Sequence, residues 1–281
     1  MKKMLSVIQI AFILVPACFG RVLDSQTFQA VRSAKMTVKP SENLRRAFLH
    51  PTLSIRSRPS RVINVMAGEG KYLECEAGGS PAPTIHWLKD GKKMPQNMYD
   101  NIGSEEDNDL MSSKPRLGLG FTRSRLFIDC ATAKDTGIYT CVAENAYLRD
   151  SKSGEVLVTQ ELESGNDALC MAKKTYGSPA RIHMWTHTRL EIMGSDVTLF
   201  CRSNGAPQPQ VTWKGPNENV LEDSQKYQML DNGDLLIHNI QWSDMGGYMC
   251  HVENAEGSDE TLIFLYPTLV KYFKNPKVEK M

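Results

Sequence analysis

Apolar and polar residues alternate with the two-residue period of β-strands in two stretches of the chain. The first stretch predicts strands at Lys71–Glu76, Thr84–Lys89, Arg125–Ile128, Ile138–Ala143 and Glu155–Gln160. The second predicts strands at Val197–Cys201, Val211–Lys214, Asp234–His238, Tyr248–Glu253 and Thr261–Tyr266. Turn signals separate the strands, among them Asp90-Gly91 and Asp231-Asn-Gly233. The pattern therefore predicts an all-β chain built from two similar groups of strands.

A seven-residue pattern, Asp-x-Gly-x-Tyr-x-Cys, occurs in both groups before their last predicted strand, at 135–141 and at 244–250. A tyrosine two residues before a cysteine is typical of the tyrosine corner of an immunoglobulin sandwich, whose core also holds an upstream cysteine and a tryptophan. The residues that carry this signature are Cys75, Trp87, Tyr139 and Cys141 in the first copy and Cys201, Trp213, Tyr248 and Cys250 in the second. We therefore predict two tandem sandwiches with the disulfides Cys75–Cys141 and Cys201–Cys250.

The two copies differ in length between the strand that holds the tryptophan and the strand that begins the Leu-x-Ile pattern. Trp87 and Leu126 lie 39 positions apart, whereas Trp213 and Leu235 lie 22 apart, so the first copy has 17 extra residues. A long loop on a rigid sandwich is either an element that contacts a partner or a tolerated surface insertion.

Two further cysteines are not required by the repeat. Of seven cysteines, Cys18 lies in the apolar N-terminal segment, and the core disulfides use four, which leaves Cys130 and Cys170. By elimination they pair, and such a bond would tie the connector between the sandwiches to the base of the first. An intermolecular disulfide and two free thiols are the alternatives.

The N-terminus has a short basic region, an apolar run from Met4 to Ala17 and small residues near position 20, which is typical of a secretory signal peptide. A membrane anchor is the alternative, and no later segment is long and apolar enough to span a membrane. We therefore expect a secreted, extracellular protein. The predicted organisation is a signal peptide (1–20), a basic extension with little fixed structure (21–60), domain 1 (61–161), a linker (162–179), domain 2 (180–268) and a C-terminal tail (269–281).

The formal charge of +1 becomes −1 once the signal peptide is removed, which gives no support for nucleic-acid binding. Basic residues nevertheless gather between Arg32 and Arg61, where eight of them stand against one acid, Glu42. This stretch either contacts sulfated glycans or is a solvated leader.

No sequence pattern indicates catalysis or a cofactor. His183 and His187 have the spacing of a helical metal site, but they lie in a segment predicted to be extended, where they would be about 13 Å apart. We expect no enzyme, no cofactor and no metal site.

The last predicted strand of the second copy is apolar on both faces. Either Ile263 and Leu265, or Leu262, Phe264 and Tyr266, must face outward. Exposed apolar strand residues commonly mark an interface, and an unpaired edge there could accept a strand. Coverage by the chain's own first domain or N-terminal strand is the alternative.

Both copies also share the spacing Leu-x-Ile-x-x-apolar-x-x-x-Asp-x-Gly-x-Tyr-x-Cys, which resembles I-set immunoglobulin domains. Its residues are Leu126, Ile128, Ala131, Asp135, Gly137, Tyr139 and Cys141, then Leu235, Ile237, Ile240, Asp244, Gly246, Tyr248 and Cys250. The stretches 124–133, 189–196 and 232–246 are similar to two groups of secreted proteins with two immunoglobulin domains. One group is the nematode zig proteins, and the other is the insect imaginal-morphogenesis protein that binds insulin-like peptides.

The resemblance implies a non-enzymatic protein that binds an extracellular protein partner. The zig group implies a role in the nervous system, in maintaining the positions of axons and neurons. The insect protein implies sequestration of insulin-like peptides and lower insulin signalling. Homophilic cell adhesion is a further hypothesis.

Overall fold

The computed structural model describes residues 50–95, 118–159 and 177–268, which are almost entirely β-structure. The elements of domain 1 are β1 (Thr52–Ser57), β2 (Val62–Met66), β3 (Lys71–Ser80), β4 (Thr84–Lys89), β5 (Lys92–Lys93), β6 (Leu119–Ile128), the 3-10 turn η3 (Ala133–Asp135), β7 (Gly137–Glu144) and β8 (Arg149–Thr159). Those of domain 2 are β9 (Ser178–Ile192), β10 (Val197–Leu199), β11 (Cys201–Ala206), β12 (Gln210–Lys214), β13 (Tyr227–Met229), β14 (Leu235–Ile237), the 3-10 turn η4 (Trp242–Asp244), β15 (Gly246–Asn254) and β16 (Gly257–Thr268). The predicted all-β fold of two immunoglobulin sandwiches is confirmed.

Strand β1 corrects the predicted extension, which was placed at 21–60. Residues 52–57 pair with β3, and Leu53 and Ile55 pack against the core of domain 1. The Ile55 N–H also donates to the Asp150 carboxylate at 3.0 Å. Arginine, serine and proline on either side hid the short Leu-x-Ile alternation in the sequence. The predicted signal peptide, residues 96–117 of the longer Trp87–Leu126 segment, Cys170 and the predicted tail lie outside the described residues.

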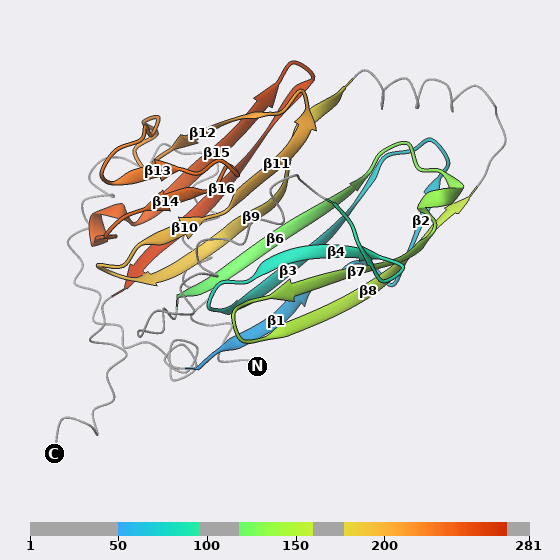
Figure 1. The fold of residues 1–281 in the computed structure, drawn as a ribbon, viewed down its shortest axis with the longest axis horizontal. Coiled ribbons are helices and arrows are strands. Elements are labelled where there is room, and N and C mark those ends of the chain that lie inside the picture. The colour runs from blue at the N-terminus through green and yellow to red at the C-terminus, as the bar shows by residue number, and fades with distance from the viewer. Residues whose placement is uncertain (1–49, 96–117, 160–176, 269–281) are drawn as a thin grey trace, which may run out of the picture. The chain divides into compact units, whose positions relative to one another are not determined.

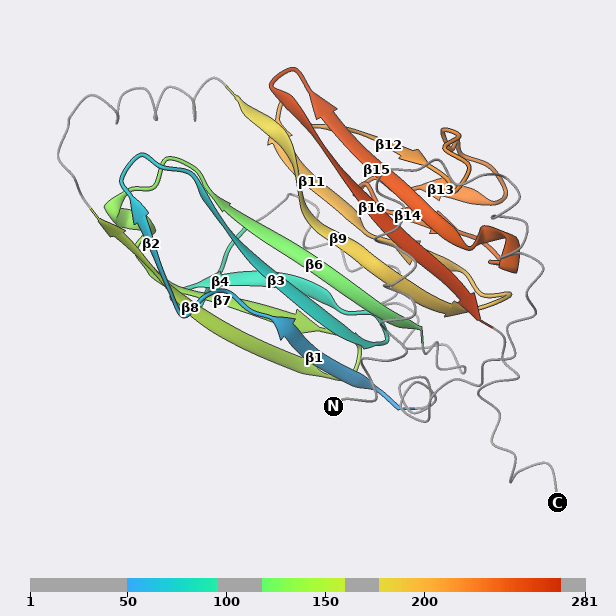
Figure 2. The same cartoon turned by 180° about the vertical axis from the view of Figure 1, so that it is seen from behind.

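The strands form three sheets (Figure 1). A five-stranded sheet, β2-β8-β7-β4-β5, belongs to domain 1, and a three-stranded sheet, β10-β14-β13, belongs to domain 2. The largest sheet contains strands of both domains in the order β1-β3-β6-β9-β16-β15-β12, with β11 paired to β9. Strands β6 and β9 lie side by side in both views (Figure 2), and their antiparallel pairing joins the two domains.

Comparison of the two domains explains how β6 can accept a strand from domain 2. In domain 2, β14 pairs with β10 on one edge and with β13 on the other. In domain 1 the equivalent strand β6 pairs with β3 and, on its second edge, with β9. The first strand of domain 2 therefore occupies the place that β13 takes in domain 2 itself.

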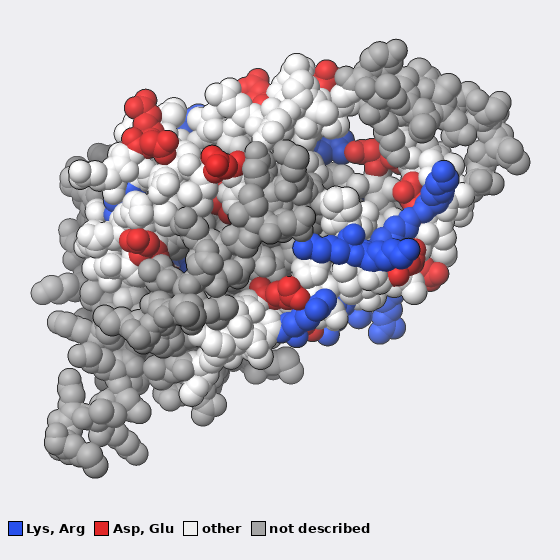
Figure 3. Space-filling view, in the orientation of Figure 1, with Lys and Arg blue, Asp and Glu red and all other residues white. Residues whose placement is uncertain are grey.

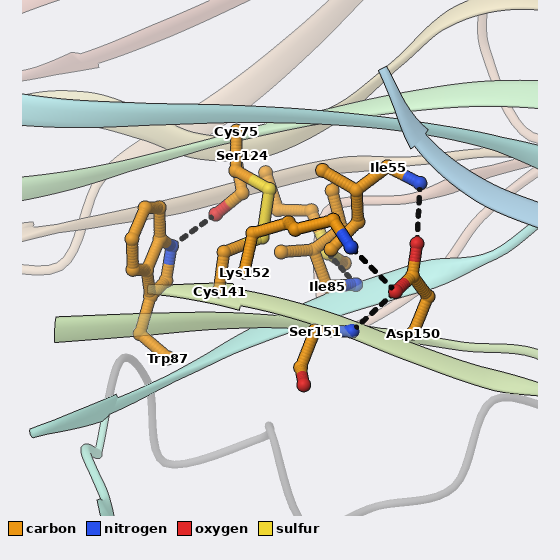
Figure 4. Close-up of a disulfide and its surroundings, with 10 residues drawn as sticks. Ile55, Cys75, Ile85, Trp87, Ser124, Cys141, Asp150, Ser151 and Lys152 are labelled. Atoms are coloured by element: carbon orange, nitrogen blue, oxygen red, sulfur yellow. Dashed lines mark hydrogen bonds and ion pairs between the residues drawn. A yellow bond between two sulfur atoms is a disulfide. The ribbon is translucent and has the colours of Figure 1, made fainter. Parts of the chain in front are cut away.

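The core of domain 1 surrounds the Cys75–Cys141 disulfide, whose Cα atoms are 6.4 Å apart. Trp87 is fully buried, and its Nε1–H donates to the Ser124 hydroxyl at 3.0 Å (Figure 4). Met184 of β9 is also part of this core, because its side chain packs there and its sulfur accepts the Ile85 N–H at 3.4 Å. Domain 2 thus completes the interior of domain 1.

The core of domain 2 repeats the arrangement around the Cys201–Cys250 disulfide, with Cα atoms 6.6 Å apart. The Trp213 Nε1–H donates to the Gly233 carbonyl oxygen at 3.0 Å. Both tyrosine corners are formed: the Tyr139 hydroxyl donates to the Asp135 carbonyl oxygen at 2.8 Å and the Tyr248 hydroxyl to that of Asp244 at 3.0 Å. These bonds fix the turn before β7 in domain 1 and before β15 in domain 2.

Cys130 of domain 1 is equivalent in the repeat to Asn239 of domain 2, because both lie two residues after the isoleucine of the Leu-x-Ile pattern. Both residues have positive φ, 51° for Cys130 and 47° for Asn239, an uncommon conformation outside glycine. Cys130 is disulfide-bonded. Because Cys170 lies outside the described residues, the Cys130–Cys170 pairing stays a prediction.

Candidate protein-binding face

The apolar strand predicted at the end of domain 2 is β16, and the structure decides which of its residues face outward. Ile263 and Leu265 are fully buried in the core of domain 2. Leu262 is 56% exposed and Phe264 40% exposed, and Tyr266 on the same face is half-buried. The second of the two predicted arrangements is therefore the one that forms.

The outward residues of β16 continue across the neighbouring strands. Residues directly opposite each other on adjacent strands share a face of the sheet. Tyr266 pairs with Leu190 of β9, and Leu190 pairs with Leu119 of β6. The outward apolar residues, here called the outer strip, are Leu119, Phe121, Leu190, Met249, Leu262, Phe264 and Tyr266.

Two more sets of paired residues extend the outer strip across neighbouring strands of the sheet. Phe121 and Phe264 both stand opposite Thr188 of β9, one from domain 1 and one from domain 2. Leu262 stands opposite Met249. The outer strip therefore crosses from domain 1 into domain 2 without leaving one sheet.

An exposed tryptophan borders the outer strip at the end of β16. The Trp242 ring contacts the Tyr266 ring edge-on, with centroids 5.9 Å apart and planes at 81°. Trp242 belongs to η4, whose Asp244 accepts the Gln241 N–H at 2.7 Å. This turn holds the indole beside the strand.

The opposite side of the sheet carries a buried ion pair where β6 meets β9. The Arg189 guanidinium contacts the Glu191 carboxylate at 3.0 Å, and both side chains are about 5% exposed. Gly118 and Gly120 lie next to them. A side chain at Gly118 would overlap Glu191, and one at Gly120 would overlap Ala82. The two glycines therefore make room for charged groups beneath the outer strip.

Arginine side chains stabilise the other half of the junction between β6 and β9, which we call the β6–β9 seam. Arg181 of β9 contacts both carboxylate oxygens of Asp129 at 2.8 Å and lies 4.8 Å from the centre of the Phe127 ring. Arg125 of β6 lies 4.8 Å from the centre of the Trp185 ring, which is buried in domain 2. Cation–π contacts of this kind add to the strand pairing.

The predicted histidine pair lies in this seam and shows no sign of a metal site. His183 and His187 both belong to β9, the extended segment that the sequence predicted. Burial and the nearby Arg123 lower the pKa of His187, and Glu76 and Glu74 oppose this shift. Among the described residues, no group of histidine, cysteine or acidic side chains is arranged to hold a metal ion.

Strand pairing excludes an unpaired edge at Phe264, Leu265 and Tyr266, whereas Leu262 and Ile263 pair with β15 and not with β9 among the described strands. Strand β16 pairs with β15 from Gly257 to Leu265 and with β9 from Phe264 to Thr268. Domain 2's own first strand covers this edge from Phe264 to Thr268, and Leu262 and Phe264 stay exposed on the face. Within the described part of the chain, no helix has the length and apolar character needed to cross a membrane.

Comparison with known proteins agrees with this architecture. Residues 51–145 match the immunoglobulin domain model, and residues 186–266 match the immunoglobulin I-set domain model. The Zwei Ig domain protein zig-2 of Caenorhabditis elegans is 36% identical over 212 residues, which are 74% of this chain and 82% of that protein. The chain belongs to the Zwei Ig domain family.

A second Zwei Ig domain protein, zig-4 of the same nematode, is 34% identical and aligns with 74% of this chain and 77% of its own length. The neural/ectodermal development factor IMP-L2 of Drosophila melanogaster is 27% identical over 80% of each chain. The crystal structure of IMP-L2 is similar to this one with a TM-score of 0.60 and 26% identity, over 79% of this chain and 98% of that one. Proteins with such domains are generally binding proteins, and nothing in these similarities indicates an enzyme.

Sequence reasoning found the β16 part of the outer strip and missed the rest. Leu119 and Phe121 alternate with glycines, and Leu190 lies between Arg189 and Glu191. The alternation was present in the sequence, but it could not show that strands from different domains are neighbours.

Proposed function

We propose that this Zwei Ig domain chain is a secreted, non-enzymatic protein that binds an extracellular protein partner in the nervous system and maintains the positions of axons and neurons. The observation that carries the proposal is the outer strip, in which Leu262 and Phe264 are exposed and the neighbouring apolar side chains, those of domain 1 included, are half-buried on the same face. Large apolar residues gathered on one exposed face commonly mark a protein interface.

The joined sheet gives the proposed interface a fixed geometry. Phe121 and Phe264 come from different domains, yet each is opposite Thr188, so one strand sets their spacing. A preorganised face loses less conformational freedom on binding than one formed by two mobile domains. The core of the interface would be the Leu262 and Phe264 side chains, surrounded by polar residues.

The family relationship supports the nervous-system role. The relatives are the Zwei Ig domain proteins and a protein named as a neural/ectodermal development factor. The disulfides around Trp87 and Trp213 are consistent with an oxidising, extracellular environment.

The test is saturable binding of the fluorescently labelled chain to cultured neurons, with non-neuronal cells as the control. We expect a saturating curve on neurons only. Equal, non-saturating binding to both cell types would contradict the proposal. Sedimentation of the chain at several concentrations checks whether a second copy is the partner, as homophilic adhesion requires.

Sequestration of insulin-like peptides is the second candidate function. It is favoured by the similarity to IMP-L2, which extends over both domains and 98% of that chain. The test is calorimetric titration of the purified chain with a panel of insulin-like peptides. Absence of binding to every peptide at micromolar concentration would exclude this function and leave the neuronal one standing.

A further inference from the structure

Four lysines gather at one end of domain 1, on elements that take no part in the joined sheet. Lys89 ends β4, Lys92 and Lys93 form β5, and Lys134 lies in η3. The Lys89 ammonium donates to the Lys134 carbonyl oxygen, which places η3 against the β4–β5 hairpin. Figure 3 shows a band of basic side chains over this part of the surface. We call these residues the lysine cluster.

The hairpin holds the lysines in place. Asp90 and Gly91 form its two-residue turn and both have positive φ, 49° and 80°, as a tight hairpin requires. The Asp90 carboxylate accepts the Ile138 N–H at 2.8 Å and fastens the turn to β7. In η3, Asp135 accepts the Thr132 N–H at 2.8 Å. The lysine cluster therefore projects from rigid elements.

One pair of charges in the lysine cluster is unfavourable for the fold. Lys89 and Lys92 stand directly opposite each other on β4 and β5, and like charges in such a pair destabilise a sheet. In the part of the chain that the structure describes, the ammonium groups of Lys92, Lys93 and Lys134 contact no carboxylate.

Four arginines of the described residues behave differently. Each of four contacts a carboxylate within 3.1 Å: Arg123, Arg125, Arg181 and Arg202. These cations support the fold, whereas the exposed lysines of β5 and η3 have no carboxylate partner within the described ranges 50–95, 118–159 and 177–268.

We propose that the lysine cluster is a binding site for sulfated glycosaminoglycan chains. Such chains are repeating polyanions, and clustered cations on a rigid surface bind them with release of counterions, as they bind other polyanions. The core disulfides are typical of the extracellular space, where these glycans occur. The site would retain the protein at cell surfaces and in matrix.

This site is separate from the outer strip. The lysine cluster lies on β4, β5 and η3, and β4 and β5 belong to the five-stranded sheet of domain 1, whereas the outer strip lies on the eight-stranded sheet. A glycan and a protein partner can therefore bind at different places, and the failure of one proposal leaves the other untouched.

The test measures the affinity of the full chain for heparin at several NaCl concentrations. In the variant Lys92→Gln/Lys93→Gln/Lys134→Gln, we expect the dissociation constant at about 0.15 M salt to rise about tenfold and its salt dependence to weaken. The melting temperature should be unchanged or higher, because charge repulsion is removed. If the melting temperature falls instead, the test uses the double variant Lys92→Gln/Lys93→Gln, which leaves η3 intact. Its dissociation constant for heparin should then rise and the salt dependence of binding should weaken.

The matched control is Arg149→Gln/Lys152→Gln/Lys214→Gln, which removes the same charge from exposed positions elsewhere. We expect this control to bind heparin almost as the unaltered chain does. The proposal is overturned if both triple variants lose affinity equally or if the unaltered chain does not bind heparin. It is also overturned if neutralising the basic residues between Arg32 and Arg46 abolishes binding while the lysine variant retains it.

Discussion

Single residues of the repeated signature act through local contacts, and these are the contacts that the sequence predicted most completely. Cysteine, tryptophan and tyrosine positions follow from spacing along one strand or one turn. The indole N–H groups of Trp87 and Trp213 donate to different acceptors, the Ser124 hydroxyl and the Gly233 carbonyl oxygen. These acceptors could not be predicted, because they depend on which strands are neighbours.

At this scale, Tyr139→Phe tests the tyrosine corner of domain 1. The change removes the hydrogen bond to the Asp135 carbonyl oxygen, so we expect the free energy of unfolding to fall by about 1 kcal/mol. Urea denaturation at neutral pH measures it. Tyr147→Phe is the control, since Tyr147 is exposed, and an equal loss in both variants would contradict the assignment.

The same tyrosine gives a prediction for alkaline pH. Burial, followed by the charges of Asp135 and Asp90, raises the pKa of Tyr139 to about 12. The unfolded chain loses this proton near pH 10 and the folded chain does not, so stability should fall as pH rises from about 10 to about 12. Denaturation over this range should show a shallower fall for Tyr139→Phe. Identical slopes would mean that Tyr139 does not contribute.

At the scale of elements, the stability of the β6–β9 seam should depend on the buried ion pair between Arg189 and Glu191. Glu191→Gln leaves the Arg189 charge without this carboxylate, and removal of one member of a buried pair costs about 3 kcal/mol. Chemical denaturation measures the loss. Lys152→Gln, which alters the exposed contact with Asp150, should cost less than about 0.5 kcal/mol. Equal losses of stability in the two variants would show that the Arg189–Glu191 pair contributes no more than an exposed ion pair.

Gly120 of β6 gives a second prediction for the stability of the seam. A methyl group at Gly120 would overlap Ala82, so Gly120→Ala should destabilise the chain by about 1–3 kcal/mol. Gly70→Ala is the matched control, because the nearest atom to an added methyl there is 3.8 Å away. Thermal unfolding separates the two. A stable Gly120→Ala protein would mean that β6 and its neighbours pack less closely than described.

Individual strands were easier to predict than the way they pair. Alternation located β3, β4 and β7 because each buries one face, but it missed β1, whose two apolar residues lie among arginine and serine. The pairing of β6 with β9 left no local signal. The 17 additional residues of domain 1 lie between Trp87 and Leu126, a segment that includes residues 96–117, which are outside the described part of the chain, and the beginning of β6.

At the scale of the whole molecule, the two domains should unfold as one cooperative unit. Met184 of β9 is buried in the core of domain 1, so Met184→Ala should cost about 2–5 kcal/mol and lower the melting temperature of both domains together. Scanning calorimetry should give one transition before and after the change. Two separated transitions, with only one shifted, would show that the domains are independent.

The central claim is that the outer strip of the joined sheet binds the protein partner. The measurement is saturable binding to cultured neurons of Leu262→Ser/Phe264→Ser beside Val62→Ser/Ile138→Ser, whose residues are 50% and 54% exposed on the other sheet of domain 1. We predict that the outer-strip variant loses at least about tenfold in affinity, as truncation of central interface residues does, and that the control binds as the unaltered chain does. Unchanged binding by the outer-strip variant would contradict the claim.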